Sequence, residues 1–507
     1  MGHRCRLTGS RLAAQRIICS LNPPKRQHMY SKSLLLLFCL ITGQSVFAQN
    51  KKTALEAIMR TYHSYNMFDG AVLVADHGKI VYKGAFGLAN REWNIPNTTD
   101  TKFMIGSVSK PLTATLALIQ VQKGLLNLDK TIGDYLPEFI NKPAAKVTIR
   151  QLLTHTSGIP NYDIIKDFFP RISRQNFTRQ DYLKLFIDSA LVFTPGTQYA
   201  YSSWGYFTLG YIMERVTNRS YAELMSSDIF GKLKMTHSGS YYHTQIVSGR
   251  ATGYDYSFGG YTSSDFRDQS NTMGTGDIYS TVEDLFTFHL ALENNTLLNK
   301  ELTNEMFTPG IGPANYGYGW FNKQFKYSPN DSVASNFHLG MTDGFISFIR
   351  RIPSTNSLVV ILCNSTPTDF FGITNNLLKA LDGQPVNIKQ PAHKKMEIYI
   401  QQLGALKAIE EYKKMKRDTA HYYIDWISMN FIAEQLLNLK RFSEAELICG
   451  NNVNEFPDKD LVMVTMGNIY LAMNKKDEAV RFYKKALEIT PGYEEAKNRL
   501  KELSRGQ

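Results

Sequence analysis

Residues 103–111 read Phe-Met-Ile-Gly-Ser-Val-Ser-Lys-Pro, and this stretch decides how the rest of the chain is interpreted. Ser107 and Lys110 lie three positions apart at the start of a segment, 109–122, whose apolar residues recur at helical spacing. Positions i and i+3 share one face of a helix, so the Lys110 amine can reach the Ser107 hydroxyl. A lysine whose pKa is lowered by desolvation or by a nearby cation can take the proton of a serine nucleophile. Alone, the pair equally fits a helix N-cap serine followed by a surface lysine.

Two further short motifs carry side chains suited to the same chemistry. Tyr201-Ser-Ser203 precedes a helical segment, where a tyrosine can relay protons if cations lower its pKa, although a lone tyrosine also fits a packed aromatic residue. His338-Leu-Gly340 leads toward a strand that we expect to begin at Phe345. A glycine on such an edge lets a substrate backbone approach, and the N–H of Met341 can point at an oxyanion. The alternative for this histidine is a partly buried ring that satisfies a loop.

Taken together and in this order, the three motifs resemble the active-site motifs of the serine β-lactamase and penicillin-binding protein family, in its class C-like branch. The resemblance covers about residues 52–383, and flanking segments add to it: Leu152-Leu-Thr-His-Thr-Ser-Gly158, Pro195-Gly196 and Gly274-Thr-Gly-Asp-Ile-Tyr-Ser280. It implies an α/β (α+β) fold in which an antiparallel sheet is flanked by helices beside an all-helical lobe.

The resemblance also implies a mechanism. Ser107 would attack a carbonyl and form an acyl-enzyme, while Lys110 and Tyr201 shuttle the proton. The backbone N–H groups of Ser107 and Met341 would form the oxyanion hole. Water or an amine would then release the acyl group, and no metal or organic cofactor is implied.

Substrate contacts are implied for Ser203, His338 and Gly340. His338 stands where relatives carry Lys or His, and would keep the local field positive beside Tyr201. Ser203 is a departure, because relatives that act on β-lactams or peptides usually have Asn there, and a serine reaches less far than an amide. We therefore expect esters, D-amino-acid peptides and β-lactams, in that order, as substrates. Residues 155–158 are interpreted as a structural turn near the site.

The sequence pattern changes after the hydrolase-like region, which we assign to residues 49–383. Residues 384–393 have the composition of a linker, and residues 394–507 show continuous helical periodicity. A 34-residue repeat pairs Ala445 with Ala479 and resembles the spacing of a tetratricopeptide repeat. We predict a small all-α domain here, which either packs on the catalytic domain or docks a protein partner.

The first 48 residues are predicted to be an export signal. Lys32 precedes the apolar run Leu34–Ile41, and small residues occupy the positions before the expected cleavage after Ala48. The run is far shorter than the ~20 residues that span a bilayer, so we expect no stable membrane span after cleavage. Met29 is an alternative start. The mature protein is expected to be periplasmic or secreted.

Charge and missing motifs narrow the function further. The 507 residues carry a net charge of +12, but residues 1–48 contribute seven bases and no acid. The other 459 residues hold 50 bases and 45 acids, a solvated surface rather than a nucleic-acid-binding face. The chain lacks His-Glu-x-x-His, Gly-x4-Gly-Lys and Gly-x-Ser-x-Gly, which disfavours zincins, nucleotide-binding proteins and α/β-hydrolases. The second hypothesis is a catalytically idle or slowly deacylating binding module.

Overall fold

The computed structural model describes residues 51–258, 260–366 and 368–505. The predicted export signal, residues 1–48, lies outside the described residues. Within the described ranges, no helix is both long enough and apolar enough to cross a membrane.

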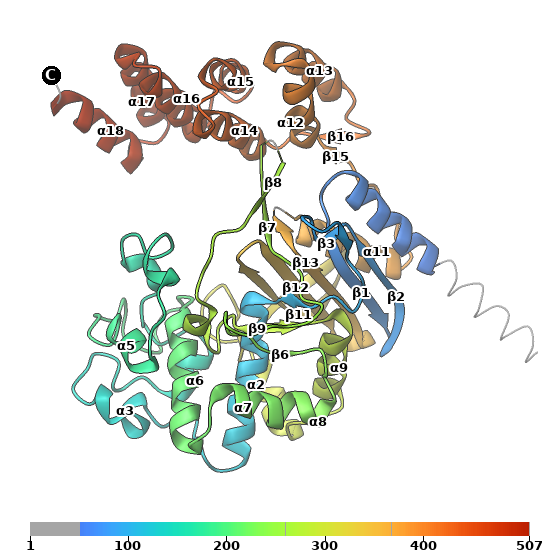
Figure 1. The fold of residues 1–507 in the computed structure, drawn as a ribbon, viewed down its shortest axis with the longest axis vertical. Coiled ribbons are helices and arrows are strands. Elements are labelled where there is room, and N and C mark those ends of the chain that lie inside the picture. Colours follow the sequence, from blue (N-terminus) through green and yellow to red (C-terminus); the bar gives the residue numbers. More distant parts are fainter. Residues whose placement is uncertain (1–50, 259, 367, 506–507) are drawn as a thin grey trace, which may run out of the picture. The chain divides into compact units, whose positions relative to one another are not determined.

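A six-stranded antiparallel sheet forms the centre of the catalytic region, in the order β10-β11-β12-β13-β1-β2 (Figure 1). Strands from opposite ends of the region pair directly, with Gly70 of β1 opposite Cys363 of β13. The strands are β1 (Gly70–Asp76), β2 (Lys79–Phe86), β10 (Phe321–Ser328), β11 (Asp331–Thr342), β12 (Phe345–Ile352) and β13 (Ser357–Cys363). β12 and β13 are buried along their whole length, β13 as its continuous apolar run favours and β12 although it includes Ser347, Arg350 and Arg351. The predicted α/β fold with an antiparallel sheet is confirmed.

Helices cover both faces of this sheet because side chains alternate along each strand. Val72 and Val74 of β1 face a core shared with a helix over residues 51–64 and with α11 (Phe370–Leu381). Ala71 and Leu73 face the larger core, which includes α2 (Ser109–Gln122), α6 (Ser203–Thr217) and α9 (Val282–Glu293). The other helices of this region are α3 (Ile132–Tyr135), α4 (Ile149–Leu153), α5 (Arg179–Lys184), α7 (Tyr221–Met225), α8 (Gly231–Leu233) and α10 (Lys300–Met306).

Short strands and turns connect these elements. The short strands are β3 (Leu88–Asn90), β4 (Ile95–Pro96), β5 (Phe103–Met104), β6 (Gly239–Ser240), β7 (Tyr254–Ser257), β8 (Gly260–Ser263), β9 (Ile278–Ser280) and β14 (Ser365–Thr366). The single-turn helices are η1 (Gly106–Val108), η2 (Pro137–Phe139), η3 (Tyr162–Ile164), η4 (Ile172–Arg174), η5 (Ser226–Phe230), η6 (Gln269–Thr272) and η7 (Pro353–Thr355).

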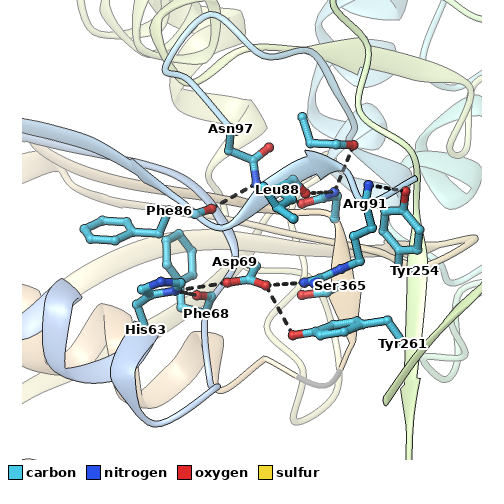
Figure 2. A network of polar contacts seen from close by, with 12 residues as sticks. His63, Phe68, Asp69, Phe86, Leu88, Arg91, Asn97, Tyr254, Tyr261 and Ser365 are labelled. Atoms are coloured by element: carbon cyan, nitrogen blue, oxygen red, sulfur yellow. Dashed lines mark hydrogen bonds and ion pairs between the residues drawn. The ribbon is translucent and has the colours of Figure 1, made fainter. Parts of the chain in front are cut away.

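A polar network fixes the base of the β7–β8 hairpin against the start of β1 (Figure 2). Asp69 lies at its centre, where it pairs with Arg91, accepts a hydrogen bond from the Tyr261 hydroxyl at 3.2 Å and lies 3.0 Å from His63 Nδ1. The Arg91 guanidinium also lies over the Tyr261 ring, 3.2 Å from its centroid, and the backbone N–H of Arg91 donates a hydrogen bond to the Tyr254 hydroxyl. The hairpin is therefore anchored at its base by charge-assisted contacts.

The C-terminal tail is a stack of helices with its own core. Gly467 explains part of the repeat pattern, because a methyl group there would lie 2.6 Å from the Tyr483 ring of the next helix. The elements are β15 (Gln390–Pro391), α12 (Ala392–Leu403), α13 (Ala405–Arg417), β16 (Tyr422–Tyr423), α14 (Trp426–Asn438), α15 (Phe442–Glu455), α16 (Asp460–Ala472), α17 (Lys476–Ile489) and α18 (Glu494–Arg505). Because α12 begins at Ala392, the helical tail starts two residues before the predicted boundary at 394.

Candidate active site

Ser107 and Lys110 come together at the junction between η1 and α2. The Lys110 Nζ atom lies 3.0 Å from the Ser107 Oγ atom. The expected helical turn is a 3₁₀ turn, since Ser107 belongs to η1 and α2 begins only at Ser109. Side chains three positions apart eclipse each other in 3₁₀ geometry, which aligns the amine with the hydroxyl.

Lys110 is a buried amine, 0% exposed to solvent. Its Nζ atom donates a second hydrogen bond, at 3.0 Å, to the backbone carbonyl of Thr275, and no carboxylate in the described residues pairs with it. Burial lowers the pKa of Lys110 to about 7, because the charged form loses its hydration. A substantial share of the amine is therefore neutral near pH 7 and free to accept a proton from Ser107.

Tyr201 lies beside this pair, just before α6. The Lys110 Nζ atom is 4.8 Å from the centroid of the Tyr201 ring. Burial raises the pKa of Tyr201, an effect only partly opposed by the nearby Ser107 hydroxyl. The condition considered from the sequence, a pKa lowered by cations, is therefore not met, and Tyr201 is a neutral phenol that can pass a proton on but does not act as the base.

The turn at residues 155–161 holds the tyrosine motif in place. His155 has a left-handed backbone (φ +56°), and its Nδ1 atom accepts the Ser202 N–H at 3.1 Å. Asn161 Oδ1 accepts the Ser203 N–H at 3.0 Å, and Ser202 caps α6 by accepting the Gly205 N–H. Asn161 was not identified from the sequence; its signal is the polar side chain that ends a Gly- and Pro-containing turn.

The other side of the site is formed by β11 and its tight turn to β12. The two turn residues, 343 and 344, have φ angles of +34° and +79°, as a primed two-residue hairpin requires. Thr342 and Phe345 then form the hydrogen-bonded closing pair, and the next pair, Met341 with Ile346, is not hydrogen-bonded. The Met341 N–H consequently points away from β12 and remains available to a ligand.

Close backbone contact brings this strand against η1. A methyl group on Gly340 would lie 2.1 Å from the Ile105 carbonyl oxygen and 2.8 Å from the Ser107 nitrogen. A methyl group on Gly106 would lie 2.9 Å from the Met341 nitrogen. Only glycine fits at these two positions. Because neither position has a side chain, the backbones approach closely, and the two predicted oxyanion-hole nitrogens, of Ser107 and Met341, lie next to each other.

His338 is neutral, in contrast to the positive charge expected there. Its Nδ1 atom donates to the Leu339 carbonyl oxygen at 2.7 Å, so its Nε2 atom accepts a hydrogen bond from the Tyr316 hydroxyl at 2.9 Å. Burial, together with the nearby Lys110 charge, lowers the pKa of His338 to about 3. The ring lies 6.3 Å from that of Tyr201 and cannot make the local field positive at neutral pH.

A cavity of about 70 Å³ opens beside the nucleophile, lined in part by Ser107, Ser203 and Met341. Of the three predicted substrate contacts, Ser203 lies in its wall. His338 is 1% exposed and belongs to the buried layer behind the site, and Gly340 contributes backbone that supports the strand.

Other reactive groups are remote from this constellation. Cys363 and Cys449 are free and buried, and burial raises the pKa of both thiols, so neither is a ready nucleophile. Across the described part of the chain, no three His, Cys, Asp or Glu side chains are grouped closely enough to hold a metal ion.

The chain is similar to proteins of known family. A family model described as Beta-lactamase matches residues 53–384. The chain belongs to the β-lactamase family. Penicillin-binding protein 4* of Bacillus subtilis (strain 168) is 29% identical over 372 residues, which cover 68% of this chain and 80% of the relative. The family match ends one residue from the boundary at 383 expected from the sequence, and a tetratricopeptide repeat model matches residues 461–493, which contain α17 and all of α16 except its first residue.

Solved structures show the same β-lactamase-family fold. A penicillin-binding protein from Bacillus halodurans has a TM-score of 0.55 at 27% identity, covering 65% of this chain and 99% of the other. A D-amino acid amidase from Ochrobactrum anthropi SV3 has a TM-score of 0.57 at 23% identity, covering 66% and 99%. The second likeness is evidence for the fold alone.

Proposed function

We propose that this protein is a serine hydrolase that forms an acyl-enzyme on Ser107 and hydrolyses an ester or amide. The observation that carries the proposal is the buried Lys110 amine, 3.0 Å from the Ser107 hydroxyl, with a pKa lowered to about 7. A base with a pKa near the working pH combines a useful neutral fraction with enough basicity to remove a proton. Membership in the β-lactamase family supports the same reaction class.

The proposed reaction consists of formation and hydrolysis of the acyl-enzyme, each accompanied by a proton transfer. Neutral Lys110 takes the Ser107 proton as Oγ bonds to the carbonyl carbon, and the N–H groups of Ser107 and Met341 stabilise the oxyanion. The proton then passes from Lys110, through the Tyr201 hydroxyl, to the leaving oxygen or nitrogen as its bond to carbon breaks. Water then attacks the acyl carbon and gives up a proton to neutral Lys110. As the bond between the acyl carbon and Ser107 Oγ breaks, Lys110 returns that proton to Oγ and the carboxylic acid leaves.

Among substrates, we place esters first. Ser203 offers a short hydroxyl where an amide side chain would contact a peptide or β-lactam carbonyl, and an ester has less need of that contact. The likeness to penicillin-binding protein 4* supports D-amino-acid peptides as the second class.

A kinetic panel on the purified chain tests the proposal. A p-nitrophenyl ester, a D-alanyl-D-alanine peptide and a chromogenic cephalosporin are compared for the wild type, Ser107→Ala and, as a control, the exposed Ser64→Ala. We expect ester turnover that falls by about a thousandfold or more in Ser107→Ala and is unchanged in Ser64→Ala. Turnover that survives in Ser107→Ala overturns the proposal, and acylation without turnover indicates a slowly deacylating sensor instead.

We propose in addition that the protein is exported and that its tail serves a protein partner. The basic start and short apolar run within residues 1–48 support export, which predicts a mature N-terminus at Gln49 by mass spectrometry. The repeat match over residues 461–493 supports a partner, since stacked repeats present extended binding surfaces. Affinity capture with the tail intact and with α16–α18 removed tests the second point.

A further inference from the structure

One wall of the cavity beside Ser107 is aromatic. Its side chains come from the segment after the 155–161 turn, from α5 and from α6, and they are Tyr162, Phe168, Phe169, Tyr182, Trp204 and Phe207. They pack against one another: Tyr162 stacks on Phe168 with ring centroids 4.9 Å apart, and the Trp204 Nε1–H donates to the Tyr182 hydroxyl at 3.4 Å. This wall is a continuous apolar surface.

The facing wall is polar, but its charges are already paired. Arg267 lies 3.0 Å from Asp343 and over the Phe169 ring, 4.5 Å from its centroid. The Asp268 carboxylate accepts hydrogen bonds from the Asn176 side chain at 2.9 Å and from the Ser270 N–H at 3.0 Å. A charged group entering the cavity would therefore lose its hydration without gaining a free counter-charge from these residues.

The position of the proton relay shows which half of the substrate this cavity receives. Ser107, Ser203 and Met341 line the cavity, whereas the Lys110 amine and the Tyr201 phenol are not part of its lining. The leaving group must face the groups that return its proton. The cavity therefore receives the acyl half of the substrate, whose carbonyl oxygen lies at the Ser107 and Met341 nitrogens.

Resting on the proposed function, we propose that this cavity selects substrates with a short, uncharged, apolar acyl group. Its volume of about 70 Å³ is roughly half the ~150 Å³ of an engineered cavity that binds benzene. Propionyl and butyryl chains fit this space, whereas a benzoyl ring or an octanoyl chain exceeds it.

A series of p-nitrophenyl esters with one leaving group tests the proposal: acetate, propionate, butyrate, octanoate, benzoate and the charged hemisuccinate. We expect kcat/KM to rise about fourfold for each methylene from acetate to butyrate, because each buried methylene strengthens binding by a transfer term of that size. Octanoate, benzoate and hemisuccinate should all fall at least tenfold below butyrate. If the substrate panel shows cleavage of amides only, the matching acyl p-nitroanilides replace the esters.

Matched variants locate the effect. Phe169→Ala opens the aromatic wall and should move the optimum toward octanoate, whereas Phe371→Ala, on α11 and equally 41% exposed, should leave the profile unchanged. A flat profile, a rise that continues to octanoate, a preference for hemisuccinate, or an identical shift in both variants overturns the proposal while Ser107-dependent turnover stands. Turnover that persists in Ser107→Ala, or no turnover of any ester or amide, removes the proposed function itself.

Discussion

At the scale of single residues, burial decides which group acts as the base. Three titratable side chains lie at the site or in the buried layer behind it, and desolvation pushes each toward its neutral form. The pKa of Lys110 falls to about 7 and that of His338 to about 3, while that of Tyr201 rises. Lys110 is thus the member of this trio that changes its charge near neutral pH.

This assignment predicts the pH dependence of the reaction. The active form of Lys110 is the deprotonated amine, so kcat/KM should rise with pH, with a midpoint near 7, and level off above it. The measurement is a pH–rate profile with an uncharged ester. Because His338 is already neutral, His338→Gln should keep the midpoint within a few tenths of a pH unit. A midpoint near the ordinary lysine value of ~10 would show that Lys110 is not desolvated in solution.

The sequence revealed the identities of these residues but not their ionisation. The spacing from Ser107 to Lys110 predicts contact, because both belong to one turn of the chain. The charge states depend on which distant segments bury them: the His338 ring is buried beside Lys110 and contacts the Tyr316 hydroxyl, groups that are 228 and 22 residues away and give no local signal. The expectation of a positive His338 failed for that reason.

Among the strands of the central sheet, the apolar ones could be predicted from the sequence, whereas the polar strand β11 could not. The hairpins at 70–86 and 345–363 follow from runs of branched apolar residues that need burial. β11 begins Asp-Ser-Val-Ala-Ser-Asn, and its first four residues are exposed or half-buried. It is a strand because β10 and β12 pair with both its edges, which is a long-range property.

The contact between β11 and η1 yields a prediction for Gly340→Ala. The added methyl would meet the Ile105 carbonyl oxygen at 2.1 Å, so the strand must move away from Ser107 and the Met341 N–H must leave the oxyanion. Loss of one such donor lowers kcat by roughly 10²–10³-fold. Steady-state kinetics on a good ester substrate measure this loss.

Gly492→Ala is the matched control, since a methyl group there meets nothing within 4 Å. Its kcat should equal that of the wild type. Unaltered kcat in Gly340→Ala, with the protein folded by circular dichroism, would mean that β11 does not position the oxyanion donor.

At the scale of the whole molecule, the β7–β8 hairpin connects the catalytic region with the helical tail. Its base is held by the Asp69–Arg91 network, and its tip residue Phe258 is 3% exposed and belongs to the core of the tail. Lys394 of α12 lies 4.2 Å from the centroid of the Tyr256 ring. These contacts show packing of the tail on the catalytic region, one of the two roles expected from the sequence; the other role, binding of a protein partner, is the one proposed for α16–α18.

Phe258→Ala tests the importance of this connection. Truncating a buried phenylalanine costs about 3–5 kcal/mol, so the variant should unfold at a temperature several degrees lower, in the transition that includes the tail. Differential scanning calorimetry measures it, with Phe431→Ala, 49% exposed on α14, as the control. Since Phe258 is remote from Ser107, kcat/KM should remain within about twofold of the wild type. An unchanged melting profile would show that the hairpin tip contributes little to stability.

Ser107 is proposed to carry the acyl group during turnover, and rapid quenching with acid can trap this adduct. Wild-type protein mixed with a butyryl ester is quenched within one turnover, digested, and mapped by mass spectrometry. We expect a butyryl adduct on the peptide that contains Ser107, and none in Ser107→Ala. Turnover with no adduct, or an adduct on Ser203 or another residue, would contradict it.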